Sequence, residues 1–253
     1  MKKYVPQDEQ EAAYLAAYNP DKWKKPSVTA DMAVFAYENK KLYLLLVERG
    51  GYPYRGCYAL PGGFADMQED LIDTARRELE EETGLCGLCL EQVSAWGTPG
   101  RDPRDRTVSV LYTALADKQK VHPQAGDDAK KAEWFCLEDY REIVTGDADT
   151  KVIERTMVLQ GSTTLCLKTK QTVRYGEYKQ TELAIVEDEG MSFDHAACIL
   201  DAYATLRLKL MTSDFAYDVL GRKPELEKMQ ALYETIFFRP FTEEELQNLP
   251  YPV

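Results

Sequence analysis

The chain has 253 residues, of which 44% are hydrophobic and 11% aromatic. This composition excludes wholesale disorder and fits one ordinary domain with a smaller one beside it. The formal net charge of -12 argues against generic attraction to nucleic acid or to an anionic membrane. The first residues lack the apolar core of a secretory signal, and the richest apolar run, residues 42–47, is too short to span a bilayer. We therefore expect a cytoplasmic protein with no membrane partner.

Residues 1–26 are predicted to form a helical arm, with a helix from Glu9 to Tyr18 that the Asn19-Pro20 pair ends. Alternating apolar runs then predict a domain of mixed strands over residues 27–145. Its expected strands are 28–37 and 42–48, which form a hairpin, followed by 57–60, 88–96, 107–115 and 132–136. One strong helix interrupts them after Pro61-Gly62-Gly63. This order favours an α+β sandwich.

Two further regions follow. Residues 146–190 contain two strand-like runs, 163–168 and 181–186, and are predicted to be an inserted hairpin or linker. Residues 191–253 are predicted to be a small helical domain, because apolar residues recur at helical spacing in 195–210 and again in 225–237.

The helix after residue 70 carries an unusual charge cluster. Asp70 is a suitable N-cap, with Asp73 three positions on as a capping-box-like partner. At about 100° per residue, Glu78, Glu81 and Glu82 fall within roughly 100° of one another along one edge of the apolar stripe. Three carboxylates in one place suit a hard divalent cation such as Mg²⁺, although a solvated acidic helix face is the simpler alternative.

The surrounding sequence favours the metal site. From Gly63 to Leu85 the chain reads G-x5-E-x7-R-E-U-x-E-E-x-G-U, with U an apolar residue. Seven fixed residue types at about 5 to 7% each match by chance with a probability on the order of 10⁻⁹ per window. The pattern resembles the signature of the Nudix hydrolases. The resemblance implies an α/β/α sandwich that hydrolyses a nucleoside diphosphate linked to another moiety with Mg²⁺ or Mn²⁺.

The resemblance also assigns roles by position. Glu78, Glu81 and Glu82 are expected to hold the metal, with the backbone carbonyl of Gly62 or Gly63 as a further ligand. Arg77 and Glu69 are expected to orient these carboxylates, and Arg77 and Glu81 are four apart and able to pair. The general base is either a glutamate of this motif or a carboxylate of a later loop. The loop candidates are Asp127 and Asp128, for which a plain turn is the alternative.

Several segments narrow the resemblance to a subgroup of ADP-ribose pyrophosphatases and Nudix-related transcriptional regulators of NAD metabolism. These segments are KPSVTADMAVF, YALPGGF, GRDPRDRTVSVLYTAL, AGDDAKKAEWF and FDHAACILDA. ADP-ribose pyrophosphatases often carry a proline about fifteen residues beyond the motif, and Pro99 lies near that position. The resemblance thus implies hydrolysis of ADP-ribose to AMP and ribose 5-phosphate, in a protein expected to be a homodimer.

The predicted substrate-binding residues are arginines and aromatics near strand ends. Forked guanidinium groups suit phosphate and ribose oxygens, although salt-bridged turns with Asp102 and Asp105 are the alternative. The candidates are Arg49, Tyr54, Arg101, Arg104 and Arg106. Tyr52, Tyr58 and Trp96 are further aromatics able to stack on adenine, with simple packing as the alternative.

A second function is an ADP-ribose-sensing regulator, whose family fuses a winged helix to the Nudix domain. Residues 191–253 hold ten acidic and six basic residues, and the last predicted helix carries Glu243, Glu244 and Glu245. Such a helix repels phosphates, so we expect a truncated winged-helix-like module and no specific binding of duplex DNA.

The six cysteines are expected to be reduced and to pack as small hydrophobic residues. Cys86 and Cys89 form a CxxC pair, but a zinc site needs two more ligands, and the sequence offers no second pair.

Overall fold

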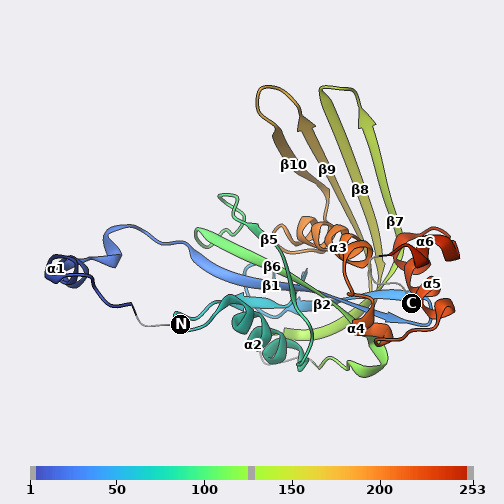
Figure 1. The fold of residues 1–253 in the computed structure, drawn as a ribbon, viewed down its shortest axis with the longest axis horizontal. Coiled ribbons are helices and arrows are strands. Elements are labelled where there is room, and N and C mark those ends of the chain that lie inside the picture. The colour runs from blue at the N-terminus through green and yellow to red at the C-terminus, as the bar shows by residue number, and fades with distance from the viewer. Residues whose placement is uncertain (1–3, 125–128, 250–253) are drawn as a thin grey trace.

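The computed structural model describes residues 4–124 and 129–249 (Figure 1). The strands are β1 Ser27–Glu38, β2 Lys41–Arg49, β3 Tyr58–Ala59, β4 Gly62–Phe64, β5 Glu91–Trp96, β6 Thr107–Asp117, β7 Ala129–Gly146, β8 Thr150–Gln160, β9 Thr164–Arg174 and β10 Gln180–Glu187. The helices are α1 Glu9–Ala17, α2 Leu71–Thr83, α3 His195–Thr212, α4 Tyr217–Leu220, α5 Leu226–Phe237 and α6 Glu243–Gln247, with single 3-10 turns at Pro20–Lys22 and Lys118–Lys120. In these two ranges, no helix is long and apolar enough to cross a membrane.

The strands described form one mixed sheet in the order β10-β9-β8-β7-β2-β1-β6-β5, with β3 paired to β2 and β4 to β1. The expected hairpin of β1 and β2 is confirmed. Asn39 and Lys40 both have positive φ at its turn, as tight hairpins require. β1 also pairs in parallel with β6, so it lies at the centre of the sheet with neighbours on both edges.

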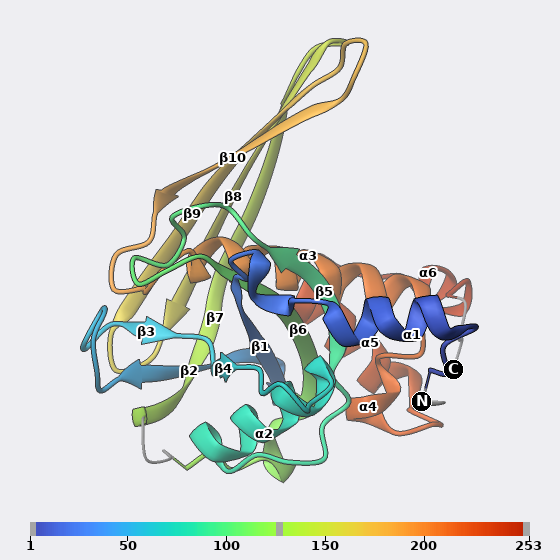
Figure 2. The same cartoon turned by 90° about the vertical axis from the view of Figure 1, so that its left-hand side faces the viewer.

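The two faces of β1 face two different cores. Met32 and Val34 belong to the core beneath α2, whereas Ala33 and Phe35 belong to the larger core beneath α3 and α5. This separation follows from the period of two along a strand. The sheet thus lies between helices on both faces, and the predicted α/β/α arrangement is confirmed (Figure 2).

The C-terminal helices share a core with the sheet. Tyr203 of α3 is fully buried, with its ring 5.8 Å from that of Phe35 in β1 and its hydroxyl donating to the carbonyl of Ile236 in α5. A helical C-terminal region is therefore present, and it covers one face of the sheet. The domain boundaries at residues 26, 145 and 190 stay predictions.

The predicted strands of the second half were wrong in extent. β7 runs ten residues beyond the expected end at Cys136, and residues 146–190 hold three strands where two runs were expected. Together β7 to β10 extend the sheet as a long projection (Figure 1). The strand missed was β8, whose sequence TKVIERTMVLQ mixes charged and apolar residues on both faces. Because most of β8 is half-buried on both sides, no clean alternation marks it.

Two local predictions were also wrong. Asp70 is the N-cap of α2, but its side chain makes no capping hydrogen bond, so the expected pairing with Asp73 is absent from this described helix. Gly84 ends the helix in the left-handed region at a φ of 68°, where glycine is favoured.

Cys86 and Cys89 are exposed and do not pack in the core. The turn that places them has two glycines with positive φ, Gly84 and Gly87, and leaves both thiols at the surface.

Candidate metal and nucleotide site

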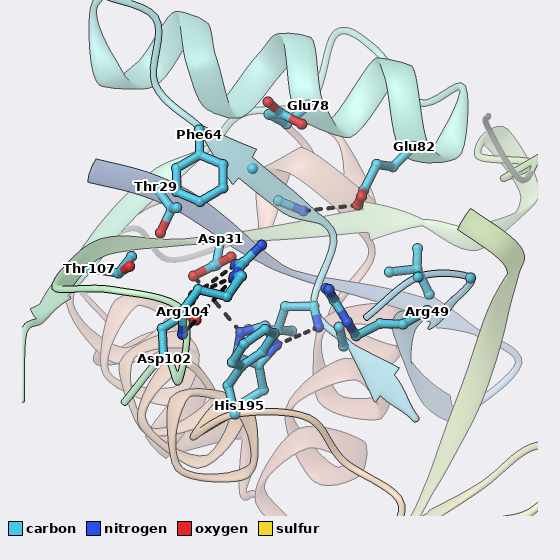
Figure 3. A pocket seen from close by; sticks show the side chains of 18 of the residues that line it. Thr29, Asp31, Arg49, Phe64, Glu78, Glu82, Asp102, Arg104, Thr107 and His195 are labelled. Carbon is cyan, nitrogen blue, oxygen red and sulfur yellow. Dashed lines mark hydrogen bonds and ion pairs between the residues drawn. The ribbon is translucent and has the colours of Figure 1, made fainter. Parts of the chain in front are cut away.

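A cavity of about 400 Å³ opens between α2, the loop before β6 and the start of α3. Glu78 and Glu82 of α2 lie along one side of it and Arg49 and Arg104 along the other, where Asp102 is paired with Arg104 (Figure 3). Its lining side chains of chemical interest are Asp31, Arg49, Phe64, Glu78, Glu82, Arg101, Asp102, Arg104, Phe193 and His195. The cavity brings together residues that are up to 166 positions apart, from Thr29 to His195.

Glu78 and Glu82 project from one face of α2 toward β4. The backbone N–H of Gly62 donates to Oε2 of Glu82 at 3.0 Å. A Cβ at Gly62 would lie 2.3 Å from the backbone carbonyl oxygen of Ala30, so this position requires glycine. A Cβ at Gly63 would lie 2.3 Å from the Glu78 carboxylate, which would have to move. The two glycines therefore let β4 lie close to both carboxylates.

Arg77 holds three carboxylates of the motif. Its guanidinium donates to Glu69 at 2.8 Å, to Glu78 at 2.7 Å and to Glu81 at 3.0 Å. The expected pairing of Arg77 with Glu81 is confirmed. It also draws the Glu81 side chain away from the cavity, where it is 59% exposed. The structure thus places Glu78 and Glu82 at the cavity and leaves Glu81 at its outer edge, contrary to the expected convergence of all three.

The electrostatics of the two inner carboxylates suit a cation. Burial raises the pKa of Glu82 to about 7, and the N–H of Gly62 lowers it only in part. Burial also raises the pKa of Glu78, partly offset by Arg77. Burial is therefore the largest influence on the pKa of both carboxylates, and a bound cation would offset it. Among the residues described, no three His, Cys, Asp or Glu side chains are arranged as a complete metal cage. Two carboxylates with room for water and phosphate oxygens nonetheless fit Mg²⁺, which commonly binds in that way.

Three of the predicted substrate arginines line the cavity. Arg101 is almost fully buried and makes a forked ion pair with Asp194, at 2.9 and 2.6 Å. Arg104 is paired with Asp102 at 2.7 Å, as the alternative of a salt-bridged turn predicted. Arg49 donates from Nε to the carbonyl of Pro53 at 2.9 Å, and burial lowers its pKa.

The other candidates lie elsewhere. Arg106 bonds the carbonyl of Thr107, and Tyr54 packs edge-on against Phe193 with ring centroids 4.8 Å apart. Neither is among the lining residues of the cavity as described. Asp127 and Asp128 lie outside the described residues.

Sequence reasoning missed Asp31, Phe193 and His195. Asp31 is 7% exposed, accepts a hydrogen bond from Ser109, and interrupts an otherwise apolar strand. A charged residue inside a buried strand was the available signal. Phe193 and His195 come from a different part of the chain and carried no signal beyond the family-like segment that contains them.

Comparisons with known proteins place the chain in one family. The model of the NUDIX domain family matches residues 26–155. The chain is 41% identical over 130 residues to the ADPR responsive transcriptional repressor NtrR of Acinetobacter baylyi, across 51% of this chain and 52% of that protein. It is 38% identical over 112 residues to the ADP-ribose pyrophosphatase of Methanocaldococcus jannaschii, across 44% and 63%. The chain thus spans about half to under two thirds of the length of these relatives.

A solved structure is similar over more of the chain. The crystal structure of a MutT/nudix family protein from Enterococcus faecalis superposes with a TM-score of 0.69 and 26% identity. The match covers 92% of this chain and 82% of that one. The likeness therefore extends beyond the NUDIX match into the C-terminal helices.

Proposed function

The chain belongs to the NUDIX family, and from this premise we propose that it is a metal-dependent pyrophosphatase. Its substrate is a nucleoside diphosphate linked to another moiety, and ADP-ribose is the specific compound we propose. The similarity to an ADP-ribose pyrophosphatase supports this choice. The reaction adds one water across the pyrophosphate and yields AMP and ribose 5-phosphate.

The observation that carries the proposal is the division of charge across one cavity. Glu78 and Glu82 lie on the α2 side, and Arg49 and Arg104 face them (Figure 3). This arrangement would suit a pyrophosphate that carries a divalent cation, since carboxylates bind the cation and guanidinium groups bind phosphate oxygens. A purely basic pocket would bind phosphate without a metal, and a purely acidic one would repel it.

The residues have separate roles in this mechanism. Glu78 and Glu82 would hold Mg²⁺ or Mn²⁺, and Arg77 keeps Glu78 oriented. A bound ion of this kind neutralises pyrophosphate charge and lowers the pKa of a coordinated water. Arg49 and Arg104 bind the phosphate oxygens, which fixes the phosphorus for in-line attack by water as its bond to the bridging oxygen breaks. Glu81 is available as a further ligand, while Asp127 and Asp128 stay predictions for the general base.

A regulator that binds ADP-ribose without cleaving it is the second candidate, because the chain is 41% identical to a transcriptional repressor over 130 residues. The charge of the C-terminal helices opposes DNA binding. The first turn of α6 holds three glutamates, and its capping box uses one of them. A cytoplasmic location and a homodimer are part of the proposal and rest on the sequence alone.

A product-resolved assay tests the two functions against each other. We expect release of AMP from ADP-ribose with Mg²⁺ or Mn²⁺ and none with chelator. Turnover of other nucleoside diphosphate derivatives, measured in parallel, will show which linked group the protein prefers. Tight binding of intact ADP-ribose without turnover, together with a gel shift of one DNA sequence that ADP-ribose abolishes, would instead identify a regulator.

A further inference from the structure

Three consecutive residues at the start of α3 contact three separate parts of the cavity. Phe193 and His195 line the cavity, and Asp194 binds an arginine that lines it. All three lie outside the NUDIX match and belong to the C-terminal part of the chain. The contacts they make are different in kind, so their effects on a ligand can be separated.

Phe193 packs against the two arginines that face the acidic side. Its ring centroid is 4.9 Å from the guanidinium carbon of Arg49 and 5.7 Å from that of Arg104. Phe64 contacts Arg104 from another direction, at 5.2 Å. Cations at these distances are attracted by an aromatic ring. Phe193 has a φ of 54°, which is uncommon for a bulky residue and directs its ring into this position.

Asp194 ties the loop before β6 to α3. Its two carboxylate oxygens accept from Nε and Nη2 of Arg101 at 2.9 and 2.6 Å. The Arg101 side chain is 5% exposed and that of Asp194 15%. A forked pair this well shielded from water fixes both groups, so Arg101 is held by the protein and is not free to reach a ligand.

His195 holds the chain segment that leads into β4. The backbone N–H of Leu60 donates to Nδ1 of His195 at 3.0 Å, so Nε2 carries the hydrogen. Nε2 lies 4.0 Å from Oδ2 of Asp31. Leu60 is two residues before Gly62, whose N–H binds Glu82. His195 is therefore linked to the Glu82 carboxylate through the backbone of residues 60–62.

We propose that Phe193 and His195 are positioning residues with separate effects, Phe193 on nucleotide affinity through Arg49 and Arg104, and His195 on turnover through the Leu60–Gly62 segment. Asp194 anchors the pair by fixing α3 to the neighbouring loop. The inference rests on the proposed function, since it assigns parts of that same site. It also makes the C-terminal helices a required part of the nucleotide site, because α3 is packed into their shared core.

Matched substitutions separate the two effects. His195→Asn keeps an acceptor near the position of Nδ1, whereas His195→Leu has a similar size and no acceptor. We expect His195→Leu to lower kcat about tenfold with little change in KM, and His195→Asn to recover most of the loss. Phe193→Leu is expected to raise KM and the Kd of ADP-ribose about fivefold with little change in kcat. Phe193→Tyr keeps the aromatic ring, so its KM and Kd should be close to those of the wild type.

The control is Leu206→Ala, a buried position three turns further along α3. Leu206 is not among the residues that line the cavity as described, so the substitution should lower stability by loss of packing while kcat and KM stay unchanged below the melting temperature of the variant. Equal kcat for His195→Asn and His195→Leu, or a fall in kcat with Leu206→Ala as large as with His195→Leu, would overturn the proposal for His195.

Two readouts do not depend on turnover. Binding of ADP-ribose is measured with chelator present, and the Nε–H signals of the arginines are followed by NMR without any ligand. We expect Phe193→Leu to weaken or shift the signals of Arg49 and Arg104 and to leave that of Arg101 in place. Unchanged signals would overturn the role of Phe193. If the wild-type protein releases no AMP, the proposed function fails, and the NMR signals still decide whether Phe193 positions the arginines.

Discussion

The two sides of the cavity are built in different ways. The acidic side comes from one continuous stretch of α2, in which Arg77, Glu78 and Glu82 lie within six consecutive positions. The basic side is assembled from Arg49, the loop holding Arg104, and Phe193 at the start of α3. Helix periodicity thus brings the carboxylates of the acidic side together, with β4 packed against them, whereas tertiary packing alone assembles the basic side. A substitution in one segment of the basic side can therefore leave the other two segments in place.

The largest expected effect comes from the acidic side. Glu82→Gln keeps an oxygen able to accept from Gly62 and removes the negative charge. We expect turnover with Mg²⁺ to fall by roughly a hundredfold or more, since the metal site loses one of its two inner carboxylates. Steady-state assays with metal titration measure it.

Glu80→Gln is the matched control, because Glu80 is exposed on the same helix and does not line the cavity as described. It should retain wild-type turnover. Near-wild-type activity in Glu82→Gln would mean that the cluster is surface charge and that the proposed mechanism is wrong.

A smaller effect is expected on the basic side. Arg49→Leu removes a guanidinium that faces the carboxylates, and we expect KM for ADP-ribose to rise roughly ten- to a hundredfold, as for loss of a charge-assisted hydrogen bond. Arg55→Leu, at an exposed position in the loop that follows β2, is the control and should leave KM unchanged. Equal changes in both variants would show that the net charge of this region matters and not the position of Arg49.

The same contrast explains how far the sequence predicted the molecule. The helix, its apolar face and the Arg77–Glu81 pair follow from spacing, and so does the hairpin of β1 and β2. The direction of Glu81 does not, because the contact with Arg77 that turns it outward competes with a place in the cavity. Phe193 and His195 were missed because their role depends on α3 crossing the sheet next to Leu60, 135 residues earlier. Spacing cannot report a contact of that range.

The projection of β7 to β10 was underestimated for a related reason. Most of β8 is half-buried and β10 is exposed along its length, so neither strand alternates clearly between buried and exposed positions. Sequence patterns detect burial on one face, so strands without that alternation give a weak pattern. The prediction for Cys86 and Cys89 failed in the opposite direction, because it expected burial and both residues are exposed. Apolar neighbours such as Leu85 and Leu88 suggested burial, while the glycines among them direct the turn outward.

The smallest expected effect is on the pH dependence of stability, and it concerns the acidic side without metal. The pKa of Glu82 is about 7 in the folded protein, against an ordinary value of about 4.3 in an unfolded chain. Between these values the folded state keeps its proton while the unfolded state has lost it. The free energy of unfolding therefore falls as pH rises from about 4.3 to about 7, and levels off above that range.

Glu82→Gln lacks this contribution, so thermal melts of the chelated proteins should show the wild type losing stability relative to the variant across that window. Adding Mg²⁺ at pH 8 should raise the melting temperature of the wild type more than that of the variant, because only the wild type offers the charged carboxylate. A constant difference in melting temperature between the two chelated proteins from pH 4 to 8 would show that Glu82 is ionised as in water, and the buried acidic side would then need no cation.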